Sequence, residues 1–576
     1  MKKPGILVAA IGVALAILLV LLASPAMAGT PETNIVSVSS DGTQGNLDSQ
    51  EANISADGSW VAFSSSATNL VLGDTNGVID VFIRDLANGT TTLVSVSDGE
   101  VLGNNWSSGP SIDADGSCVA FTSEASNLVS GADNAGVVDI FVRDLANGTT
   151  KLVSVSDGEV AGNDYSGEAS ISADGSCVAF SSWATNLGGG GLEQDIFLRD
   201  MTNGTTTLVS VSDDEAAENA WSQSPSVDAD GSCVAFASQA SNLVNGADNA
   251  GVVDIFVRDL ANGTTTLVSV SSLGEPGNNT SHTPSIDADG SCVAFQSSAT
   301  NLVPEDTNGA YDVFVHDLLT GITRLVSVSS EGTLGNGWSY SPSIDADGSC
   351  VAFMSFATNL VPEDTNGTSD VFVHDLLTGI TRLVSVSSAG TQGDRKSNMP
   401  SISADGSSVA YASYATNLVS GDINGKYDVF VSAPVPAPAS RQATGHHRYE
   451  QTDPVIVYSG QWDTGSDDSH SGGSNFYSDD PEGTITITFK GTRLDWIAAL
   501  GPLMGKALVS IDGGEPVLVD LFSQTELFQQ LVWSSGTLEY GVHVIKITFP
   551  TDGGEVKPIN IDALDVWGVL LETTQT

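Results

Sequence analysis

The chain has 576 residues, which is too many for one ordinary core, so we expect two domains or one large repeat array. Lys and Arg total 19 against 70 Asp and Glu, a formal net charge of -51, which argues against nucleic acid and against an anionic membrane surface as partners. Hydrophobic residues make up 40% of the chain and charged residues 15%, which argues against disorder.

Residues 1–28 have the pattern of a secretory signal peptide. Lys2 and Lys3 precede an apolar run over 6–22, and Ala26-Met27-Ala28 provides the small residues of a cleavage site. The rest of the chain has no run of about 20 apolar residues, the length that a membrane span needs. We therefore expect export to the extracellular space, the cell surface or the periplasm; an uncleaved anchor is the alternative.

The following segment repeats itself seven times with a period of 56 to 59 residues, marked by Asp-Gly pairs that begin at Asp57, Asp115, Asp174, Asp230, Asp289, Asp347 and Asp405. Each unit predicts four short strands, of the types PSID, CVAFSS, DVFVRD and TTLVSVS. Asp-Gly, Asn-Gly or Thr-Gly turns join the strands in pairs, because Gly supplies the positive φ that tight hairpins need. Four antiparallel strands at a fixed period predict an all-β propeller.

The two ends of the array complement each other. The seventh unit stops after its third strand, at 428–431, whereas residues 34–39 match a spare fourth strand ahead of the first unit. We predict that the N-terminal strand completes the last blade and closes a seven-bladed ring over 34–431, since closure removes unpaired strand edges.

The units resemble the TolB-type (WD40-like) propeller repeat, in which a Ser-Pro-Asp-Gly turn precedes a Val/Ile-Ala-Phe strand. Here the turn is Ala-Asp-Gly-Ser, so the Pro is missing while Asp-Gly and the strand remain. The resemblance implies a fold and leaves the function open.

The loop between the second and third strands of several units carries Asp-x-Asn-Gly-x-x-Asp, which is similar to part of a calcium-binding loop. The candidate metal ligands are Asp74, Asn76, Asp80, Asp306, Asn308, Asp312, Asp364, Asn366, Asp370, Asp422, Asn424 and Asp428. Variants occur at 133–139 and 248–254, and the third unit has four glycines at 188–191 instead. The alternative is that Asp and Asn only stabilise turns, because the first acidic residue and the distal Glu of the full pattern are missing.

The loop between one unit's fourth strand and the next unit's first strand carries an aromatic residue at one equivalent position, namely Trp106, Tyr165, Trp221 and Trp338. Thr280 and Lys396 occupy this position in two other units. By strand order, both loop types lie on the same face of the disc, where exposed aromatics would stack on a sugar or a protein ligand. Packing between blades is the alternative.

Five cysteines occupy one equivalent position in units two to six: Cys118, Cys177, Cys233, Cys292 and Cys350. Equivalent points on different blades lie too far apart for a disulfide. We therefore predict five buried free thiols.

A Pro- and Ala-rich linker is predicted over 432–448, followed by a second β domain over 449–576. Segments such as TITITFKG, the Val-x-Ile-Asp-Gly-Gly hairpin over 509–514 and the closing strand over 561–566 resemble, in their order, the galactose-binding-like jelly roll of secreted bacterial proteins. The resemblance implies a β-sandwich that binds carbohydrate, with candidate stacking residues Trp462, Trp496, Trp533 and Trp567, some of which we expect in the core.

The sequence contains no nucleophile motif, Walker loop, HExxH helix or CxxC pair. Its acidic residues recur from unit to unit, whereas a catalytic pair of carboxylates is asymmetric. We therefore expect a non-catalytic secreted protein that binds a glycan or a protein, with no required cofactor and with calcium as an open possibility. The alternative is a polysaccharide hydrolase or lyase with an appended binding module.

Overall fold

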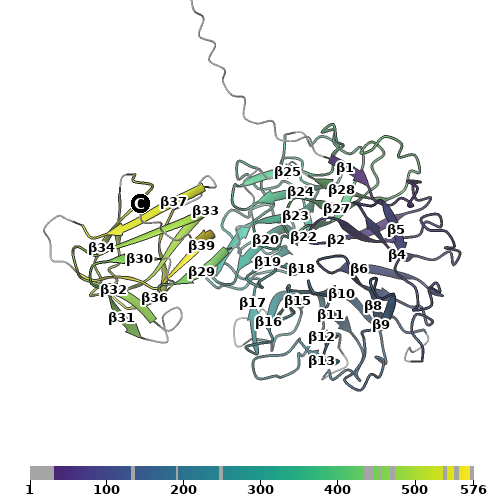
Figure 1. Ribbon diagram of the computed structural model, residues 1–576, viewed down its shortest axis with the longest axis horizontal. Coiled ribbons are helices and arrows are strands. Elements are labelled where there is room, and N and C mark those ends of the chain that lie inside the picture. The colour runs from purple at the N-terminus through teal and green to yellow at the C-terminus, as the bar shows by residue number, and fades with distance from the viewer. Residues whose placement is uncertain are drawn as a thin grey trace, which may run out of the picture.

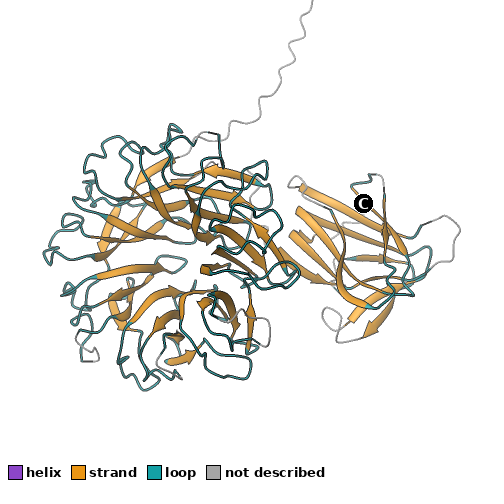
Figure 2. Ribbon diagram, turned by 180° about the vertical axis from the view of Figure 1, so that it is seen from behind, coloured by secondary structure: helices purple, strands orange, loops and turns teal. Residues whose placement is uncertain are grey.

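Figure 1 shows the computed structural model, in which a disc of radiating β-sheets lies beside a smaller β domain. It describes residues 32–570 except 132–135, 190–192, 245–250, 363, 434–445, 453–455, 467–473, 515, 536–540 and 551–556. The predicted signal peptide lies outside the described residues. The regular structure of the described residues is entirely β (Figure 2), and no described helix has the length and apolarity to cross a membrane.

Residues 32–433 form seven four-stranded antiparallel sheets, which we call blades 1 to 7. Blades 1 to 3 consist of β2 (Ser49–Ile54), β3 (Trp60–Ser65), β4 (Asp80–Asp85) and β5 (Thr90–Leu93); β6 (Ser107–Ile112), β7 (Cys118–Ser123), β8 (Asp139–Asp144) and β9 (Thr149–Leu152); and β10 (Ser166–Ile171), β11 (Cys177–Ser182), β12 (Asp195–Asp200) and β13 (Thr205–Leu208). Blades 4 and 5 consist of β14 (Ser222–Val227), β15 (Cys233–Ser238), β16 (Asp254–Asp259) and β17 (Thr264–Leu267); and β18 (Ser281–Ile286), β19 (Cys292–Ser297), β20 (Asp312–Asp317) and β21 (Ile322–Leu325). Blades 6 and 7 consist of β22 (Ser339–Ile344), β23 (Cys350–Ser355), β24 (Asp370–Asp375) and β25 (Ile380–Leu383); and β26 (Ser397–Ile402), β27 (Val409–Ser413), β28 (Asp428–Ala433) and β1 (Glu32–Ile35).

The N-terminal strand lies where the sequence predicts it. β1 pairs antiparallel with β28, so that Glu32 faces Ala433 and Ile35 faces Phe430. A second set of contacts joins all seven blades, because the backbone N–H of each Ala-Asp-Gly turn donates to the carbonyl of the next. This ring runs Ala56, Ala114, Ala173, Ala229, Ala288, Ala346, Ala404 and back to Ala56, with N···O distances of 2.9 to 3.1 Å. The array therefore closes on itself.

The strands differ from the prediction at both edges of each blade. The fourth strand is shorter, because the Val-Ser-Val-Ser segment leaves the sheet after one further backbone bond, from Val94 N–H to the Val81 carbonyl. Its buried Ser95 hydroxyl instead donates to Asp80 at 2.8 Å. The first strand begins earlier and contains a bulge at a residue of positive φ, such as Glu51, which the sequence did not reveal.

Aromatic residues pair within the core of each blade, and small residues pack at the contact between one blade and the next. Phe63 and Phe82 stack at 5.8 Å between the middle strands of blade 1, and every blade has an equivalent aromatic pair. The Asp-Gly turn of one blade packs on the Cys of the blade before it: a Cβ on Gly231 would approach the Cys177 sulfur to 2.7 Å. Gly is required there for its positive φ and for this close approach.

All five cysteines are free, as predicted, but only Cys177 and Cys350 are fully buried. The prediction of complete burial is wrong for the other three, Cys118, Cys233 and Cys292.

The C-terminal region forms two further sheets. Its strands are β29 (His446–Glu450), β30 (Val457–Ser459), β31 (Asp463–Ser466), β32 (Ser474–Ser478), β33 (Thr484–Leu500), β34 (Lys506–Ile511), β35 (Val517–Asp520), β36 (Leu527–Ser534), β37 (Gly541–Thr548), β38 (Ile559–Ile561) and β39 (Ala563–Leu570). Eight of them form one sheet around the long β33, and β31, β32 and β38 form the other. β29 starts at residue 446 and β28 ends at 433, so the regular structure extends into both ends of the predicted 432–448 linker.

Candidate ligand-binding face

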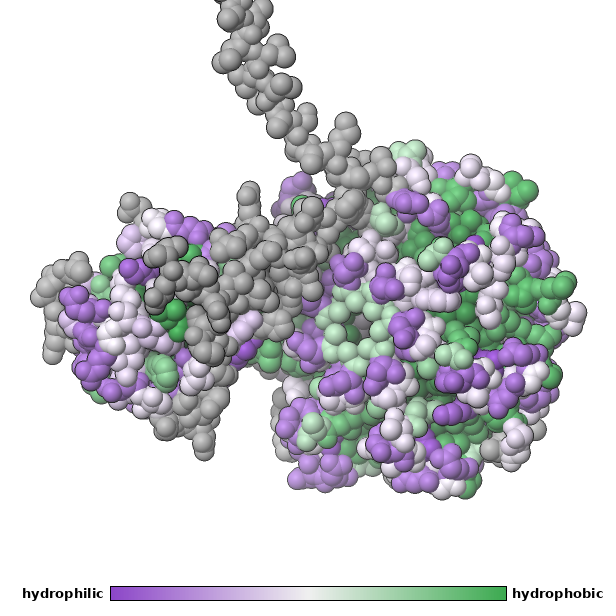
Figure 3. Space-filling view, in the orientation of Figure 1, coloured by the Kyte–Doolittle hydropathy of each residue, from purple (hydrophilic) through white to green (hydrophobic). Residues whose placement is uncertain are grey.

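Two kinds of loop meet at one end of the blades, as the strand order predicts. In blade 1, the Asn76 amide in the loop between β3 and β4 donates to the carbonyl of Gly103, in the loop that enters blade 2, at 3.1 Å. Blades 5, 6 and 7 have the same bond from Asn308, Asn366 and Asn424. We call this end of the propeller the loop face. Figure 3 shows the disc from one side, with a hollow at its centre.

The four predicted aromatics all lie in the loops of this face but differ in exposure. Trp106 is half-buried, and its Nε1–H donates to Glu124 at 2.8 Å. Trp221 is half-buried and packs against the apolar core of blades 4 and 5. Tyr165 is 38% exposed, and burial of its hydroxyl, with Glu168 nearby, raises its pKa. Trp338 is 57% exposed, the most of the four, so the repeat position serves packing in some blades and presents a free ring in another.

Trp338 belongs to a group of aromatic rings on blades 5 and 6. Its ring lies 6.4 Å from that of Tyr340, edge to face, and Tyr340 lies 5.4 Å from Tyr311. Phe356, 45% exposed, lies beside Trp338, whose carbonyl accepts the Phe356 N–H at 2.8 Å. These rings form an apolar platform at the loop face.

Blade 7 carries a second pair of aromatic rings, which is covered by cations. The guanidinium of Arg395 lies 4.9 Å above the Tyr414 ring, and the ammonium of Lys396 lies 5.0 Å above the Tyr427 ring. The two tyrosine rings are 5.3 Å apart. We define the aromatic–cation surface as seven residues, namely Tyr311, Trp338, Tyr340, Arg395, Lys396, Tyr414 and Tyr427.

Sequence reasoning placed Trp338 correctly but missed the rest of this surface. The available signal was that exposed Arg395 and Lys396 interrupt the repeat in a chain of strongly negative charge. Their side chains rest on aromatic faces, an arrangement that stabilises a cation and holds it in place.

In blades 1, 6 and 7, the Asn residue of each predicted calcium loop is held in hydrogen bonds within its own loop. The Asn366 amide donates to Asp370 at 2.7 Å, while its oxygen accepts the Thr368 N–H at 2.8 Å. Asn76 and Asn424 make the same two bonds with their own loops. Among the described residues, no group of three or more His, Cys, Asp or Glu side chains is placed to hold a metal ion. Parts of the variant loops at 133–139 and 248–254 lie outside the described residues.

The last carboxylate of each of these loops is buried. Burial raises the pKa of Asp80, Asp312, Asp370 and Asp428 to about 6, although a serine hydroxyl from the fourth-strand segment donates to each. The cause is the loss of water around a charged group, which hydrogen bonds offset only in part.

Blade 3 has a different arrangement, which the sequence analysis also missed. Six units have Gly at the end of the loop that enters the next blade, at Gly45, Gly103, Gly162, Gly277, Gly335 and Gly393, and the remaining unit has Glu218. Its carboxyl lies beside buried Asp195 and accepts the Ser222 hydroxyl. Burial, with Asp195 adding to it, raises the pKa of Glu218 to about 10, so the group is neutral at pH 7. The signal was the break in the repeat.

A cavity of about 680 Å³ lies along the outer strand of blade 6 and the loop that enters blade 7. Leu360, Val361 and Leu383 provide apolar lining, and Thr365, Asn366 and Arg382 provide polar groups. Its volume is in the range of small-molecule sites.

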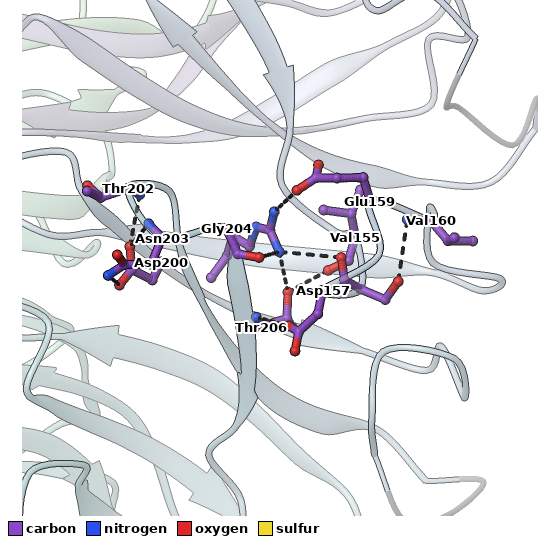
Figure 4. Close-up of polar contacts among 11 residues, drawn as sticks. Val155, Asp157, Glu159, Val160, Asp200, Thr202, Asn203, Gly204 and Thr206 are labelled. Atoms are coloured by element: carbon purple, nitrogen blue, oxygen red, sulfur yellow. Dashed lines mark hydrogen bonds and ion pairs between the residues drawn. The ribbon is translucent and has the colours of Figure 1, made fainter.

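The opposite end of the blades carries the Asn-Gly and Thr-Gly turns and an ionic contact. Figure 4 labels Glu159, Gly204 and Thr206, the partners in this contact in blade 3. Arg199 donates to Glu159 of the previous loop, to Thr206 and to the Gly204 carbonyl. The Thr206 hydroxyl in turn donates to the Val155 carbonyl. These bonds fasten the loop between blades 2 and 3 to the outer strand of blade 3.

The C-terminal tryptophans are mostly structural. Trp496 is completely buried in the core, so it has no face to offer a ligand and its prediction as a stacking residue is wrong. Trp533 pairs with it across β33 and β36 and is half-buried. Trp462 is half-buried, donates to the Ser459 carbonyl at 3.0 Å and packs edge to face on Tyr458. The side chain of Trp567 lies outside the described residues.

Comparison with known proteins finds no matching family model. The A type blood N-acetyl-alpha-D-galactosamine deacetylase of Flavonifractor plautii is 29% identical over 98 residues, which is 17% of this chain and only 13% of that protein. Among solved structures, TolB from Acinetobacter baumannii matches with a TM-score of 0.33 and 15% identity, over 58% of this chain and 62% of that one.

Two further solved structures cover more of their own chains. The oligogalacturonate lyase in complex with manganese has a TM-score of 0.41 at 14% identity, over 71% of this chain and 90% of that one. The β-propeller domain of the Trilobed protease from Pyrococcus furiosus has a TM-score of 0.42 at 13% identity, over 68% and 94%. The structural neighbours are thus TolB-type and other β-propeller proteins. They include a lyase and a protease domain, and because every TM-score is below 0.5 and every identity is below 25%, these likenesses support no conclusion about function.

Proposed function

We propose that this chain is a secreted, non-catalytic carbohydrate-binding protein, whose propeller binds an acidic glycan at the aromatic–cation surface. The observation that carries the proposal is that exposed Trp338 and the tyrosine-seated cations Arg395 and Lys396 lie in equivalent loops of the adjacent blades 6 and 7. Aromatic faces suit the apolar faces of sugar rings, and fixed cations suit a carboxylate or sulfate.

The charge of the molecule supports an acidic ligand at this place. With a net charge of -51, most of the surface repels an anion, and binding requires a local cluster of positive charge. Arg395 and Lys396 are exposed and already ordered on rings, so less side-chain entropy is lost when they bind.

The C-terminal sheets have a separate place in the proposal. We propose that they form a galactose-binding-like sandwich that attaches the protein to a cell-surface or cell-wall glycan. The order of its strand motifs in the sequence supports this. Calcium, if it binds, would have a structural part in the propeller.

The test compares the full mature chain with two variants by calorimetry on neutral and uronate-containing oligosaccharides. Trp338→Ala removes the free ring, and binding should weaken about tenfold or more for both kinds of glycan, since truncation of a central aromatic commonly costs over 1 kcal/mol. The matched control is Trp183→Ala, which removes a 39%-exposed tryptophan from the loop that follows β11 in blade 3 and should leave binding unchanged.

A second variant tests the acidic part of the ligand. Arg395→Gln with Lys396→Gln should weaken binding of the uronate oligosaccharides and spare the neutral ones. Equal binding by wild type and Trp338→Ala, or equal loss in Trp183→Ala, would refute the proposed surface.

A further inference from the structure

The loop face contains pairs of buried carboxylates, and the blades differ in whether a side-chain amide donates to both members of the pair. In blade 6, the side-chain nitrogen of Gln392 donates to both members of a pair, to Asp364 at 2.8 Å and to Asp370 at 2.9 Å. In blade 7, Gln44 makes the same two bonds to Asp422 and Asp428, at the same two distances. One amide thus fills a slot between two acids.

Blade 5 has the pair but lacks the amide. Gln392 and Leu334 occupy equivalent positions, since each forms an isolated bridge to the valine of its Val-Ser-Val-Ser segment, Val386 and Val328. A leucine has no donor to place between Asp306 and Asp312. The Asn308 amide nitrogen bonds to the Gly335 carbonyl at 3.0 Å. It lies close enough to Asp312 to offset part of the rise that burial causes in the pKa of that carboxyl, but it makes no hydrogen bond of ordinary geometry with it.

The consequence is a set of buried oxygens without hydrogen bonds. Asp306 is only 5% exposed, and neither of its carboxylate oxygens has a hydrogen-bond partner; the same holds for Oδ2 of Asp312, which is completely buried. The Asn308 backbone N–H lies near Asp306 and offsets part of the cost of burial, but it makes no hydrogen bond of ordinary geometry. A buried ionised carboxylate without a partner costs several kcal/mol, so a ligand of positive charge is expected at such a place.

We propose that Asp306 and Asp312 bind a hard divalent cation, of which calcium is the type, in the slot that Gln392 fills in the next blade. This goes beyond the proposed glycan binding and is independent of it. The amide nitrogen of blade 6 lies within 2.9 Å of both carboxylates, and calcium–oxygen distances are about 2.3–2.6 Å, so a shift of a few tenths of an ångström would bring both acids into contact with the ion. Thr307 and Asn308 beside the pair are exposed, which gives water access to complete the coordination.

The same comparison explains why the four loops are not equivalent. Blades 6 and 7 are filled by an amide and should not bind the ion. Blade 1 has Leu102 at the position of Leu334, but there Asn76 donates to Asp80 at 2.8 Å, and Oδ1 of Asp74 is the one oxygen of the pair that is buried without a hydrogen bond. Blade 5 is therefore the strongest site.

The experiment exchanges the two residues and measures calcium alone on the full mature chain. Leu334→Gln should fill the slot, so calorimetry should count one tight calcium site fewer, and calcium should raise the melting temperature less than it does for wild type. Gln392→Leu should open the blade 6 slot and add one site. Weak calcium binding elsewhere on this acidic chain is common to all three proteins and cancels in the comparison.

Two further measurements keep the outcomes distinct. Asp306→Asn, which retains shape and removes charge, should lose the same site as Leu334→Gln. Equal calcium stoichiometry in wild type and Leu334→Gln, or no gain in Gln392→Leu, overturns the proposal. So does a difference between wild type and Leu334→Gln that depends on pH in EDTA and not on calcium, because the two acids would then share a proton.

Discussion

Blades 2 to 4 and blades 5 and 6 use different residues on the third strand to make the same contact with a threonine of the outer strand. On the third strand, blades 2, 3 and 4 have Arg143, Arg199 and Arg258, each paired with a glutamate of the previous loop. Blades 5 and 6 have His316 and His374 at this position. All five side chains face a threonine of the outer strand, whose hydroxyl donates to a valine carbonyl of the preceding blade.

The comparison shows that the position needs a hydrogen-bond donor, whether charged or neutral. Arg143 donates to Thr150 at 3.1 Å, and His316 Nδ1 lies 2.8 Å from the Thr323 oxygen. Since the Thr323 proton is already donated to Val270, the histidine must donate, which assigns the proton to Nδ1. Burial lowers the pKa of His374 to about 4, so this ring is neutral where the arginine is charged. In blades 2 to 4 the arginine also pairs with a glutamate, whereas Arg84 of blade 1 makes the same bond to its threonine, Thr91, at 2.9 Å.

The strongest way to break the comparison is to remove the charged donor. Arg199→Ala leaves Thr206 and the Gly204 carbonyl without their partner and should lower the free energy of unfolding by about 3–5 kcal/mol, because a guanidinium that is only 4% exposed makes several hydrogen bonds that are lost together. His374→Ala, which removes one neutral bond, should cost about 1–2 kcal/mol more than the loss of packing alone. Urea denaturation measures both. Equal losses in the two variants would contradict the distinction.

The second test concerns the loop face, where blade 3 has a carboxyl beside the third-strand acid and blades 6 and 7 have an amide. Glu218→Gln places an amide there too. Because the folded pKa of about 10 exceeds the ordinary value of 4.5, the folded state retains a proton that the unfolded state loses. The free energy of unfolding of the wild type should therefore fall, as the pH rises from 4.5 to about 10, by up to about 1.4 kcal/mol per pH unit.

Glu218→Gln should thus be more stable than wild type at pH 8, with the difference shrinking toward pH 5. Denaturation curves at the two pH values measure this. The matched control is Gln392→Glu, which makes the reverse change in blade 6 and should introduce the same sign of pH dependence. A difference between Glu218→Gln and wild type that does not change with pH would show that the glutamate is ionised in the folded state.

The third test uses acid to distinguish the histidine blades from the arginine blades. The pKa of His374 is lowered from 6.5 to about 4, so the unfolded state binds a proton that the folded state does not. The stability that the neutral His374 ring contributes to the fold is lost as the pH falls below 6.5, at up to about 1.4 kcal/mol per pH unit. His374→Gln, which retains a donor, should remove this part of the acid sensitivity, as seen in the melting temperature at pH 5 and pH 7. An unchanged pH profile would mean that the histidine already carries its proton in the fold.

The smallest effect is expected from replacing the exposed glutamate that pairs with each arginine. The side chain of Glu159 is 69% exposed, so Glu159→Gln should cost less than about 1 kcal/mol, and salt should remove the difference. Denaturation at low and high salt checks this. A loss as large as that of Arg199→Ala would mean that the ion pair, and not the bonds to the outer strand, carries the stability.

The repeat made the propeller predictable, whereas the site depends on exceptions to the repeat. Period, turn residues and the split last unit indicated seven four-stranded modules and the pairing of the N-terminal strand, because these follow from local hydrogen-bonding and turn geometry. Lys396 and Glu218 occupy positions where other units have different residues, whereas Trp338 differs from Trp106 and Trp221 only in its exposure. A single sequence shows that a residue departs from the repeat, but it does not show the role of that residue. The role depends on which residues of the neighbouring blades surround it.

By itself, the sequence determined that this chain builds β modules with tight turns, that they repeat, and that its cysteines stay apart. Each of these depends on residues close together in the chain or on equivalent positions that symmetry keeps distant. Only the tertiary structure decided which aromatic is free, which carboxylates receive an amide, and that Arg395 and Lys396 rest on tyrosines. Those outcomes depend on burial and on contacts between segments far apart in sequence, so they arise only when the blades are brought side by side.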